Sequence, residues 1–402
     1  MFETYPLIAT IVTCVIFASL LGFLANRLHL PTILGYLLAG IMLGPYTPGL
    51  IADINIAKQL AEIGIILLMF GVGLHFSVKD LLNVHRIALP GAIVQIAITT
   101  LICLVVAMIM RHNFLESFIF GLTLSVASTV VLLRAFEQHK MMDSNVAKIA
   151  VGWLIAEDII MIIILVLLPT FAYMMQEKVT NLQVILETIF LTIIKIIAFV
   201  MVMIMVGKKL LPKLLLAIAK TKSRELISLG ILAIASGFAF IAYTIFGASF
   251  ALGAFMAGFI LNESDIGKKS AEKSLPLQDL FAVLFFISAG MLFDPSVLFK
   301  EPVLIIIALL LVVFGKSIVA YIIMRFFRQN VFNSLILAVS IAQIGEFSFI
   351  LTALALKLGV LSPILYDMVI ASAILSITLN PFLFKLAKKF KVDSNKPITH
   401  SK

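Results

Sequence analysis

The 402-residue sequence is poor in charge, because Asp, Glu, Lys and Arg make up 13% of it, against about 25% in an average soluble domain. Hydrophobic residues make up 62%, and the mean hydropathy is +1.16. This balance excludes a soluble enzyme and a disordered chain. Only two cysteines are present, Cys14 and Cys103, and both lie in apolar runs, which excludes a disulfide scaffold.

Sequence signatures of cofactor chemistry are also missing. There is no glycine-rich dinucleotide or phosphate loop and no cluster with the spacing of metal ligands. We therefore expect no cofactor, no resident metal and no enzyme activity. No nucleophile–base pair is visible either.

Long hydrophobic runs dominate the sequence instead. A transmembrane helix needs about 20 mostly apolar residues, and by that rule the sequence predicts an all-α polytopic membrane protein of thirteen spans. They lie near 7–25, 31–47, 57–76, 87–110, 115–136, 146–173, 182–206, 224–245, 247–262, 277–293, 302–324, 331–356 and 364–386.

The basic residues predict the orientation, because Lys and Arg collect in cytoplasmic loops. With the N-terminus outside, 23 of the 30 Lys and Arg residues fall in inner loops and the tail, and five fall outside. Lys195 and Lys316 remain within spans. The net charge of +9 is therefore a topology signal, and no nucleic-acid partner is expected.

Three short motifs recur in the same order at offsets of 215 to 218 residues: 34–43 with 252–261, 73–76 with 290–293, and 125–127 with 340–342. The offset spans seven helices, and an odd number turns the second copy upside down in the membrane. Helices 1–6 and 8–13 then form an inverted repeat, over about 1–175 and 222–390, with a connector helix at about 180–207. We expect one transmembrane domain over 1–390 and a short tail at 391–402. Inverted repeats are typical of secondary transporters, whose ion sites lie between discontinuous helices.

The sixth span carries two adjacent carboxylates, Glu157 and Asp158. A charge in the hydrocarbon costs roughly 2.5–3.5 kcal/mol even on the lenient insertion scale, so each one needs a role. Helix neighbours diverge by about 100°, so one carboxylate should face a cavity and the other a helix or the pathway wall. The functional interpretation is a carboxylate that exchanges a proton for a cation. The alternative is a buried ion pair that only holds helices together.

Small and polar residues at mid-span mark the fifth and twelfth spans. They are Ser125, Ser128 and Thr129 in the fifth, and Ser340, Gln343 and Glu346 in the twelfth. Such stretches unwind and offer carbonyl groups to a cation, or they serve as ordinary packing contacts between helices. Glu346 is suited to neutralise the N-termini of broken half-helices.

Lys316 lies mid-span in the eleventh helix. Two interpretations are open: a static counter-ion, or a lysine that competes with the cation for Asp158. Gln95 is interpreted as structural. His29 and His139 fall at predicted helix ends or in loops, and no role beyond pH sensing is assigned to them.

Several motifs together resemble one family. They are Leu30-Pro31-Thr32-Ile33-Leu34-Gly35-Tyr36-Leu37-Leu38-Ala39-Gly40, Ala61-Glu62-Ile63-Gly64, Phe70-Gly71-Val72-Gly73-Leu74, Leu252-Gly253-Ala254-Phe255-Met256-Ala257-Gly258, Leu284-Phe285-Phe286-Ile287-Ser288-Ala289-Gly290-Met291 and Gln343-Ile344-Gly345-Glu346-Phe347. Over nearly all of 1–390, the chain is similar to the Kef-type branch of the bacterial cation:proton antiporter-2 family.

The resemblance implies the sodium/proton antiporter fold: thirteen helices, crossing helices 5 and 12, and a core domain that moves against a dimerisation domain in a homodimer of the bacterial inner membrane. It implies that Asp158 carries the ion and that Thr129 and Ser128 contribute to the site. Lys316 and Glu346 are implied as supporting charges.

The chain departs from the family pattern in two places. Glutathione-gated members have Gln before the aspartate and electrogenic relatives have Asp, whereas this chain has Glu157. Many relatives continue into a cytoplasmic nucleotide-binding regulatory domain, while this sequence ends about fifteen residues after the last span. We expect either a short member or one from which that domain is missing.

The predicted function is monovalent cation:proton antiport, K⁺ or Na⁺ against H⁺, by alternating access. Asp158 binds cation or proton, with Glu157, Thr129 and Ser128 beside it. The alternative is a channel-like potassium efflux pathway, gated by a regulatory domain or partner outside this sequence. A sensor or assembly scaffold with an inactive core is a third hypothesis. The intact Asp158, Thr129 and Lys316 argue against it.

Overall fold

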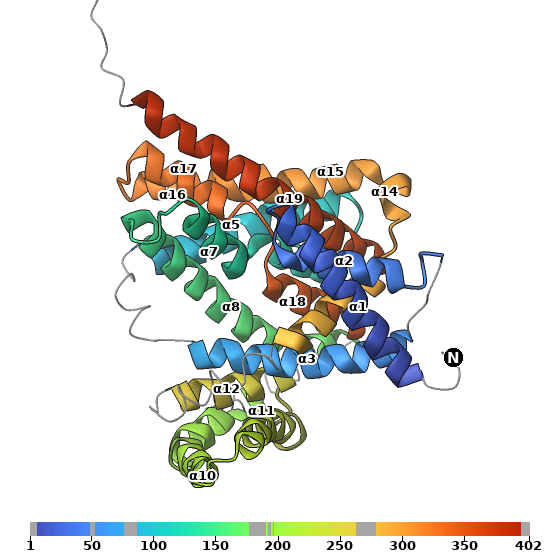
Figure 1. Cartoon of the computed structure of the whole chain (residues 1–402). Helices are drawn as coiled ribbons and strands as arrows, with labels where there is room; N and C mark the ends of the chain where they lie inside the picture. Colours follow the sequence, from blue (N-terminus) through green and yellow to red (C-terminus); the bar gives the residue numbers. More distant parts are fainter. Residues whose placement is uncertain are drawn as a thin grey trace, which may run out of the picture. The chain divides into compact units, whose positions relative to one another are not determined.

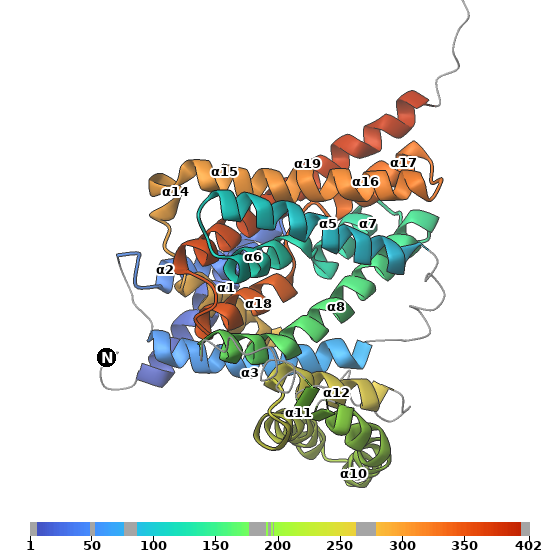
Figure 2. The same ribbon diagram turned by 180° about the vertical axis from the view of Figure 1, so that it is seen from behind.

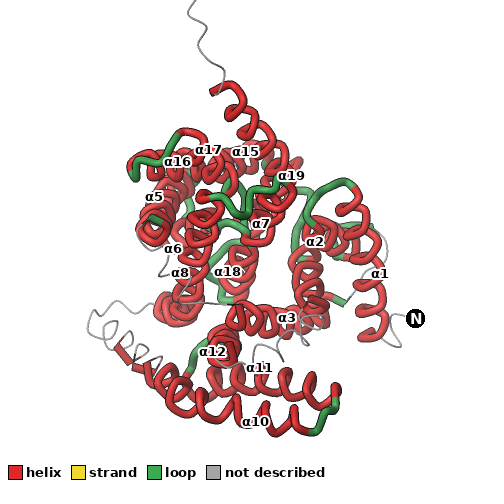
Figure 3. The backbone as a smooth tube through the Cα atoms, turned by 60° about the vertical axis from the view of Figure 1, so that its left-hand side comes forward, coloured by secondary structure: helices red, strands yellow, loops and turns green. Residues whose placement is uncertain are grey.

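The computed structural model describes residues 6–48, 53–75, 87–176, 190–191, 194–195, 197–262 and 279–394. Within these ranges every regular element is a helix, as Figure 3 shows in red. Eight helical stretches among them are long and apolar enough to cross a membrane. They are Pro6–Arg27, Ile54–Leu74, Ala88–Ile109, Phe114–Gln138, Asn145–Ala172, Glu225–Phe246, Pro302–Phe326 and Pro363–Phe390.

Four shorter apolar helices, Thr32–Leu43, Phe250–Asn262, Asp279–Met291 and Val331–Ser340, coincide with further predicted spans. Twelve of the thirteen predicted spans thus have a helical counterpart among the described residues. The connector helix predicted at about 180–207 lies largely outside them, as does most of the tail at 391–402.

The chain divides into two compact units that cut across the predicted repeats. Unit 1 comprises 1–22, 35–77 and 161–292, and unit 2 comprises 23–34, 78–160 and 293–402. Each unit therefore takes helices from both halves of the sequence. The repeat boundaries themselves stay a prediction.

Unit 2 contains the two spans that the sequence marks as discontinuous. The fifth span is broken into α6 and α7, and the twelfth into α17 and α18. Figure 1 labels α7, α17 and α18, and Figure 2 also labels α6. Helix α6 packs on α5 and α18, while α19 packs on α15 and α17. The bounds in unit 2 are α5 Ala88–Ile109, α6 Phe114–Ser125, α7 Thr129–Gln138, α14 Val297–Lys300, α15 Pro302–Leu310, η2 Leu311–Lys316, α16 Ser317–Phe326, α17 Val331–Ser340 and α18 Glu346–Lys357, with α19 at Pro363–Ser394.

The eleventh span runs as one line from α15 through η2 to α16, as Figure 2 shows along the upper edge. Its middle, Leu311–Lys316, is wound as a π-helix that ends at the predicted site residue Lys316. Short π-helical segments are rare and are frequent at functional sites.

Unit 1 is built around α3 (Ile54–His75), which packs against α12 (Phe250–Asn262). The remaining helices of this unit are most of α1 (Pro6–Arg27) and α2 (Thr32–Leu43), the end of α8 (Asn145–Gln176), η1 (Met203–Gly207), α10 (Lys208–Lys220), α11 (Arg224–Phe246) and the helix Asp279–Met291. Helix α11 packs on α12 and on α10.

Glycines of the repeated motifs make the closest helix contacts in unit 1. A Cβ on Gly40 would overlap the carbonyl oxygen of Ile287, and one on Gly290 would overlap that of Leu37. The same pairing holds between α3 and α12. A Cβ on Gly258 would overlap the carbonyl oxygen of Phe70, and one on Gly73 would overlap that of Phe255. Under the sequence offset, the pair formed by α2 and the helix Asp279–Met291 maps onto the pair formed by α12 and α3. The repeat is thus expressed in the contacts and not only in the sequence.

Basic side chains end several helices in an unusual backbone conformation. All five non-glycine residues of positive φ in the described ranges are basic: His29, Arg111, Lys140, Lys222 and Arg328. Each follows the last turn of a helix, and its N–H donates to a carbonyl three residues earlier. Glycine usually holds this position, and a larger residue costs about 1–2 kcal/mol there. A basic side chain offsets part of that cost by its interaction with the negative end of the helix dipole.

We expect Gly258→Ala to destabilise the protein by about 1–3 kcal/mol, because the new methyl group meets the backbone of α3 at Phe70. Gly237→Ala on α11 is the matched control, since nothing lies within 4 Å of the added Cβ there. It should be neutral or stabilising by up to about 1 kcal/mol, because alanine favours helices. Thermal unfolding of both variants in one detergent measures the difference, and equal melting temperatures would contradict the close approach.

Candidate functional site

The candidate site lies in unit 2, where the two interrupted spans meet. Helix α6 ends at Ser125, and the chain is extended at Val126 and Ser128 before α7 begins at Thr129. Helix α17 ends at Ser340, and α18 begins after an extended Gly345. The predicted discontinuities are therefore present in both spans.

The two breaks touch each other through their backbones. The N–H of Gly345 donates to the carbonyl of Val126 at 3.2 Å. A side chain at Gly345 would overlap the carbonyl of Ala127, so only glycine allows this approach. The crossing point is thus an ordered contact between the two halves of the sequence.

Gln343 supplies hydrogen bonds to the break in the other span. Its Oε1 accepts from the N–H of Ser128 at 3.0 Å, and its Nε2 donates to the carbonyl of Ser128 at 3.1 Å. Gln343 is fully buried. It pairs with Ser128 as one peptide group would pair with another, and this replaces bonds that a continuous helix would have made.

Lys316 binds both breaks at once. Its ammonium group donates to the carbonyl of Val126 at 3.1 Å and to the carbonyl of Gln343 at 2.6 Å. These carbonyls lie just beyond the C-terminal ends of α6 and α17, where helix dipoles place negative charge. The side chain is fully buried, and Glu157 is a carboxylate that interacts with it electrostatically. Lys316 therefore stabilises the crossing, and it makes no hydrogen bond to Asp158 in the described part of the chain.

The adjacent carboxylates have different surroundings, as their helical positions predict. Glu157 is fully buried, and its Oε2 accepts from the N–H of Ala127 at 2.8 Å. Asp158 is half-buried, and its Oδ2 accepts from the hydroxyl of Thr129 at 3.4 Å. The second oxygen of each carboxylate, Oε1 of Glu157 and Oδ1 of Asp158, has no hydrogen-bond partner.

A third carboxylate, Glu346, belongs to the same group. Its Oε2 accepts from the hydroxyl of Ser128 at 3.1 Å. Glu346 and Glu157 are the charged groups that act on Asp158. Carboxylate and hydroxyl oxygens from Asp158, Glu346, Thr129 and Ser128 therefore gather beside the breaks, and these are the ligands that a hard monovalent cation prefers.

Two predicted residues are turned away from this group. The hydroxyl of Ser125 donates to the carbonyl of Leu122 at 2.8 Å, and that of Ser340 donates to the carbonyl of Ile336 at 2.5 Å. Both bonds stay within the residue's own helix. In this structure the two serines fit the packing interpretation.

Gln95 on α5, which the sequence analysis interpreted as structural, is a further partner of the break. Its Nε2 donates to the carbonyl of Ser125 at 3.0 Å, and its Oε1 accepts from the indole N–H of Trp153 at 3.5 Å. Both side chains are fully buried. A buried amide in an apolar span was the available signal, but its target could not be read from the sequence.

The fold and the site together define a class, the multi-pass membrane transporters in which two interrupted helices cross beside intramembrane carboxylates. Residues 13–386 match the family described as the transmembrane region of sodium/hydrogen exchangers, and the chain belongs to that family. This family comprises transporters and is not a class of catalytic enzymes.

Among curated relatives, the chain is 48% identical over 390 residues to YbaL of Escherichia coli (strain K12), which is classed provisionally as a cation/proton antiporter. The match covers 97% of this chain and 70% of YbaL. K(+) efflux antiporter 5 of Arabidopsis thaliana is 29% identical, over 94% of this chain and 66% of its own length.

Among solved structures, the sodium proton antiporter MjNhaP1 of Methanocaldococcus jannaschii has the same fold. The TM-score is 0.70, and the match covers 97% of this chain and 99% of the other at 16% identity. The fold predicted from the sequence is thus confirmed.

We expect Lys316→Met to destabilise the protein by about 3–5 kcal/mol, because two buried carbonyls lose a charged donor and Glu157 loses its counter-charge. Lys195→Met is the matched control, since Lys195 is an exposed lysine of a predicted span. Thermal unfolding in detergent compares the two variants. A loss of similar size in both would contradict the role assigned to Lys316.

Proposed function

We propose that the protein exchanges a monovalent cation, K⁺ or Na⁺, for protons, and that Asp158 carries either one. The observation that carries this proposal is the half-buried Asp158 carboxylate, which has one oxygen free of hydrogen bonds and lies beside hydroxyl and carboxylate oxygens at the helix crossing. Membership of the sodium/hydrogen exchanger family and the likeness to YbaL support cation:proton antiport.

The charges of the cluster favour a bound cation or proton. Asp158, Glu157 and Glu346 are three carboxylates, and Lys316 is the ammonium group among them. With all four ionised, the formal charge would be −2. A cation or a proton reduces this repulsion, and a single carboxylate cannot hold both, so binding of one displaces the other.

Glu157 has a separate role in this proposal. Its side chain accepts a hydrogen bond from the N–H of Ala127 and interacts electrostatically with Lys316. Glu157 therefore positions the break, while Asp158 exchanges the ion. One carboxylate that titrates per cycle corresponds to one proton per cation.

Alternating access then requires the site to face each side of the membrane in turn. The backbone of the breaks is bonded by Lys316, Gln343 and Gln95, so these bonds do not have to form or break when the ion leaves. We propose that unit 2 carries the ion as one body, in a homodimer of the bacterial inner membrane with the N-terminus outside. The Lys and Arg distribution supports the orientation, and the family resemblance supports the dimer.

A cytoplasmic regulatory domain is proposed as a partner, because many members of the family that the sequence motifs resemble continue into such a domain. The match to YbaL covers 70% of its length. The channel-like potassium efflux pathway stays as the alternative. The Arabidopsis relative is named a K(+) efflux antiporter, so its name supports K⁺ as the exchanged cation. The two candidates differ in one measurable property, which is the movement of protons with the cation.

We expect Asp158→Asn to abolish exchange, reducing it at least about 100-fold, because an amide cannot accept a proton or neutralise a cation. The measurement is proton movement in proteoliposomes with an internal pH dye after addition of K⁺ and then Na⁺. Glu157→Gln is the matched variant, and it should keep activity within about tenfold, because an amide oxygen still accepts from Ala127. Persistent exchange in Asp158→Asn would rule out the assignment, and cation flux without proton movement would favour the channel.

Competition at one carboxylate also predicts a pH dependence. At pH values below the pKa of the carrier, the cation concentration for half-maximal rate should rise about tenfold for each unit by which the pH falls. The maximal rate should change little. Initial rates over a grid of pH and cation concentration measure this. A half-saturating concentration that does not depend on pH would mean that the two ions use different groups.

A further inference from the structure

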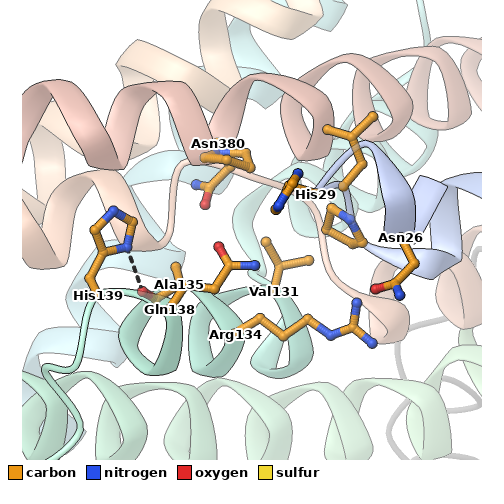
Figure 4. A pocket seen from close by; sticks show the side chains of 11 residues that line it. Asn26, His29, Val131, Arg134, Ala135, Gln138, His139 and Asn380 are labelled. Carbon is orange, nitrogen blue, oxygen red and sulfur yellow. Dashed lines mark hydrogen bonds between the residues drawn. The ribbon is translucent and has the colours of Figure 1, made fainter.

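A polar cavity lies in unit 2, and none of the site carboxylates lines it. Three segments line it: the turn after α1 at Asn26–Pro31, the C-terminal half of α7, and α19 at Asn380 and Pro381. Figure 4 shows the side chains that face it. Its volume is about 90 Å³. Since one water takes about 30 Å³ of liquid, this space suits a few waters or one tetrahedral oxyanion.

The lining of this cavity is basic and amide-rich. Its titratable side chains are Arg134, His29 and His139, and none of its lining residues is a carboxylate. The guanidinium of Arg134 is half-buried and makes no hydrogen bond or ion pair within the described ranges. An arginine directed into a small cavity without a counter-charge is a typical partner for a planar or tetrahedral oxyanion.

Asn380 provides an independent observation. It is fully buried, and its Nδ2 donates to the carbonyl of Val339 at 2.8 Å. Because the amide nitrogen is fixed by this bond, the amide oxygen must be Oδ1 as drawn, and it has no hydrogen-bond partner. A buried acceptor without a donor costs about 1–3 kcal/mol, so a ligand that donates a hydrogen bond to Oδ1 would remove this cost.

The two observations together restrict the ligand. Figure 4 places Asn380 and His29 on one side of the cavity and Arg134 on the other, where the Arg134 side chain extends toward Asn26. Arg134 requires negative charge, whereas the Oδ1 atom of Asn380 requires a hydrogen-bond donor. A fully deprotonated anion meets only the first requirement, and a water or a neutral alcohol meets only the second.

We propose that this cavity binds an oxyanion that keeps a hydroxyl proton, with the hydrogen phosphate group as its chemical type. The charged oxygens lie toward Arg134, and the hydroxyl group donates to Asn380. The same chemistry is offered by free phosphate and by a lipid with a phosphomonoester head group. Both remain within the proposal, and the experiment separates them.

The position of the cavity gives the ligand a consequence for transport. Helix α7 carries Arg134 and begins at Thr129, which bonds Asp158. The segment 23–34 belongs to unit 2, while the helical residues before and after it along the chain belong to unit 1. An oxyanion bound by Arg134 and His29 would therefore link α7, which contributes Thr129 to the ion site, to the segment 23–34, which joins two stretches of unit 1 along the chain.

The test is ligand-dependent stabilisation of the purified full chain, followed by the fluorescence of its single, fully buried tryptophan, Trp153. Inorganic phosphate and sulfate are titrated near pH 7 at constant ionic strength. We expect a saturable rise in melting temperature with phosphate and a clearly smaller one with sulfate, because sulfate has no proton for Asn380. Stabilisation by phosphate that equals that by sulfate, or none by phosphate and by lipid alike, would overturn the proposal.

Variants locate the site. Arg134→Gln should weaken phosphate binding about tenfold or more, since a charge-assisted hydrogen bond is lost. Lys148→Gln is the matched control, because it removes one exposed positive charge from the neighbouring helix α8. His29→Gly tests a second wall residue without strain, since glycine accepts the positive φ of that position. Equal effects of Arg134→Gln and Lys148→Gln would show an unspecific charge effect and contradict the site.

Lipid nanodiscs distinguish the two sources of the group. Phosphatidylcholine discs with and without phosphatidate are compared in the absence of free phosphate. Stabilisation by phosphatidate that Arg134→Gln removes identifies a lipid head group, whereas stabilisation by inorganic phosphate alone identifies a free ion. Either result supports the cavity as an oxyanion site.

Discussion

The structure of the site depends on one constraint: a helix interrupted inside a bilayer has no water to bond its exposed peptide groups. Around the break between α6 and α7, buried side chains supply the missing bonds. Gln95 binds the carbonyl of Ser125, Lys316 that of Val126, and Gln343 both peptide groups of Ser128. Each of these side chains would be costly in an apolar span on its own. Together they make an extended backbone stable at mid-depth.

This arrangement divides the charged residues by role. Lys316 and Glu157 both bond to the backbone of the breaks, so removing either would leave buried peptide groups without partners. Asp158 bonds only to a hydroxyl and to no backbone group. Ion exchange at Asp158 therefore changes the charge of the site without dismantling the crossing that holds it. The positive charge of Lys316 offsets part of the cluster's negative charge and does so from a fixed position.

The inverted repeat explains why the same close contact between helix backbones occurs twice. In unit 1, α2 meets the helix Asp279–Met291 in the way that α12 meets α3, with a glycine of one helix against a carbonyl of the other. Close approach of backbones is a common means of association in membranes, where burial of apolar surface contributes little between helices. In unit 2, the two breaks meet through Gly345 and Val126. Each unit therefore contains parts of both repeats, and neither repeat is a compact body by itself.

The sequence alone determined the membrane class, the position of twelve spans, the two interrupted helices and the carboxylates at mid-span, because hydrophobic length, small polar residues and repeated motifs are local properties of the chain. The different surroundings of Glu157 and Asp158 also follow from the angle between helix neighbours. Only the tertiary structure decided that Lys316 bonds two carbonyls instead of Asp158, that Gln95 serves the break, and that 26–31, 131–139 and 380–381 enclose one cavity. A helical pattern states which residues share a face, but a hydrogen bond or a cavity depends on which face of a distant helix packs against it.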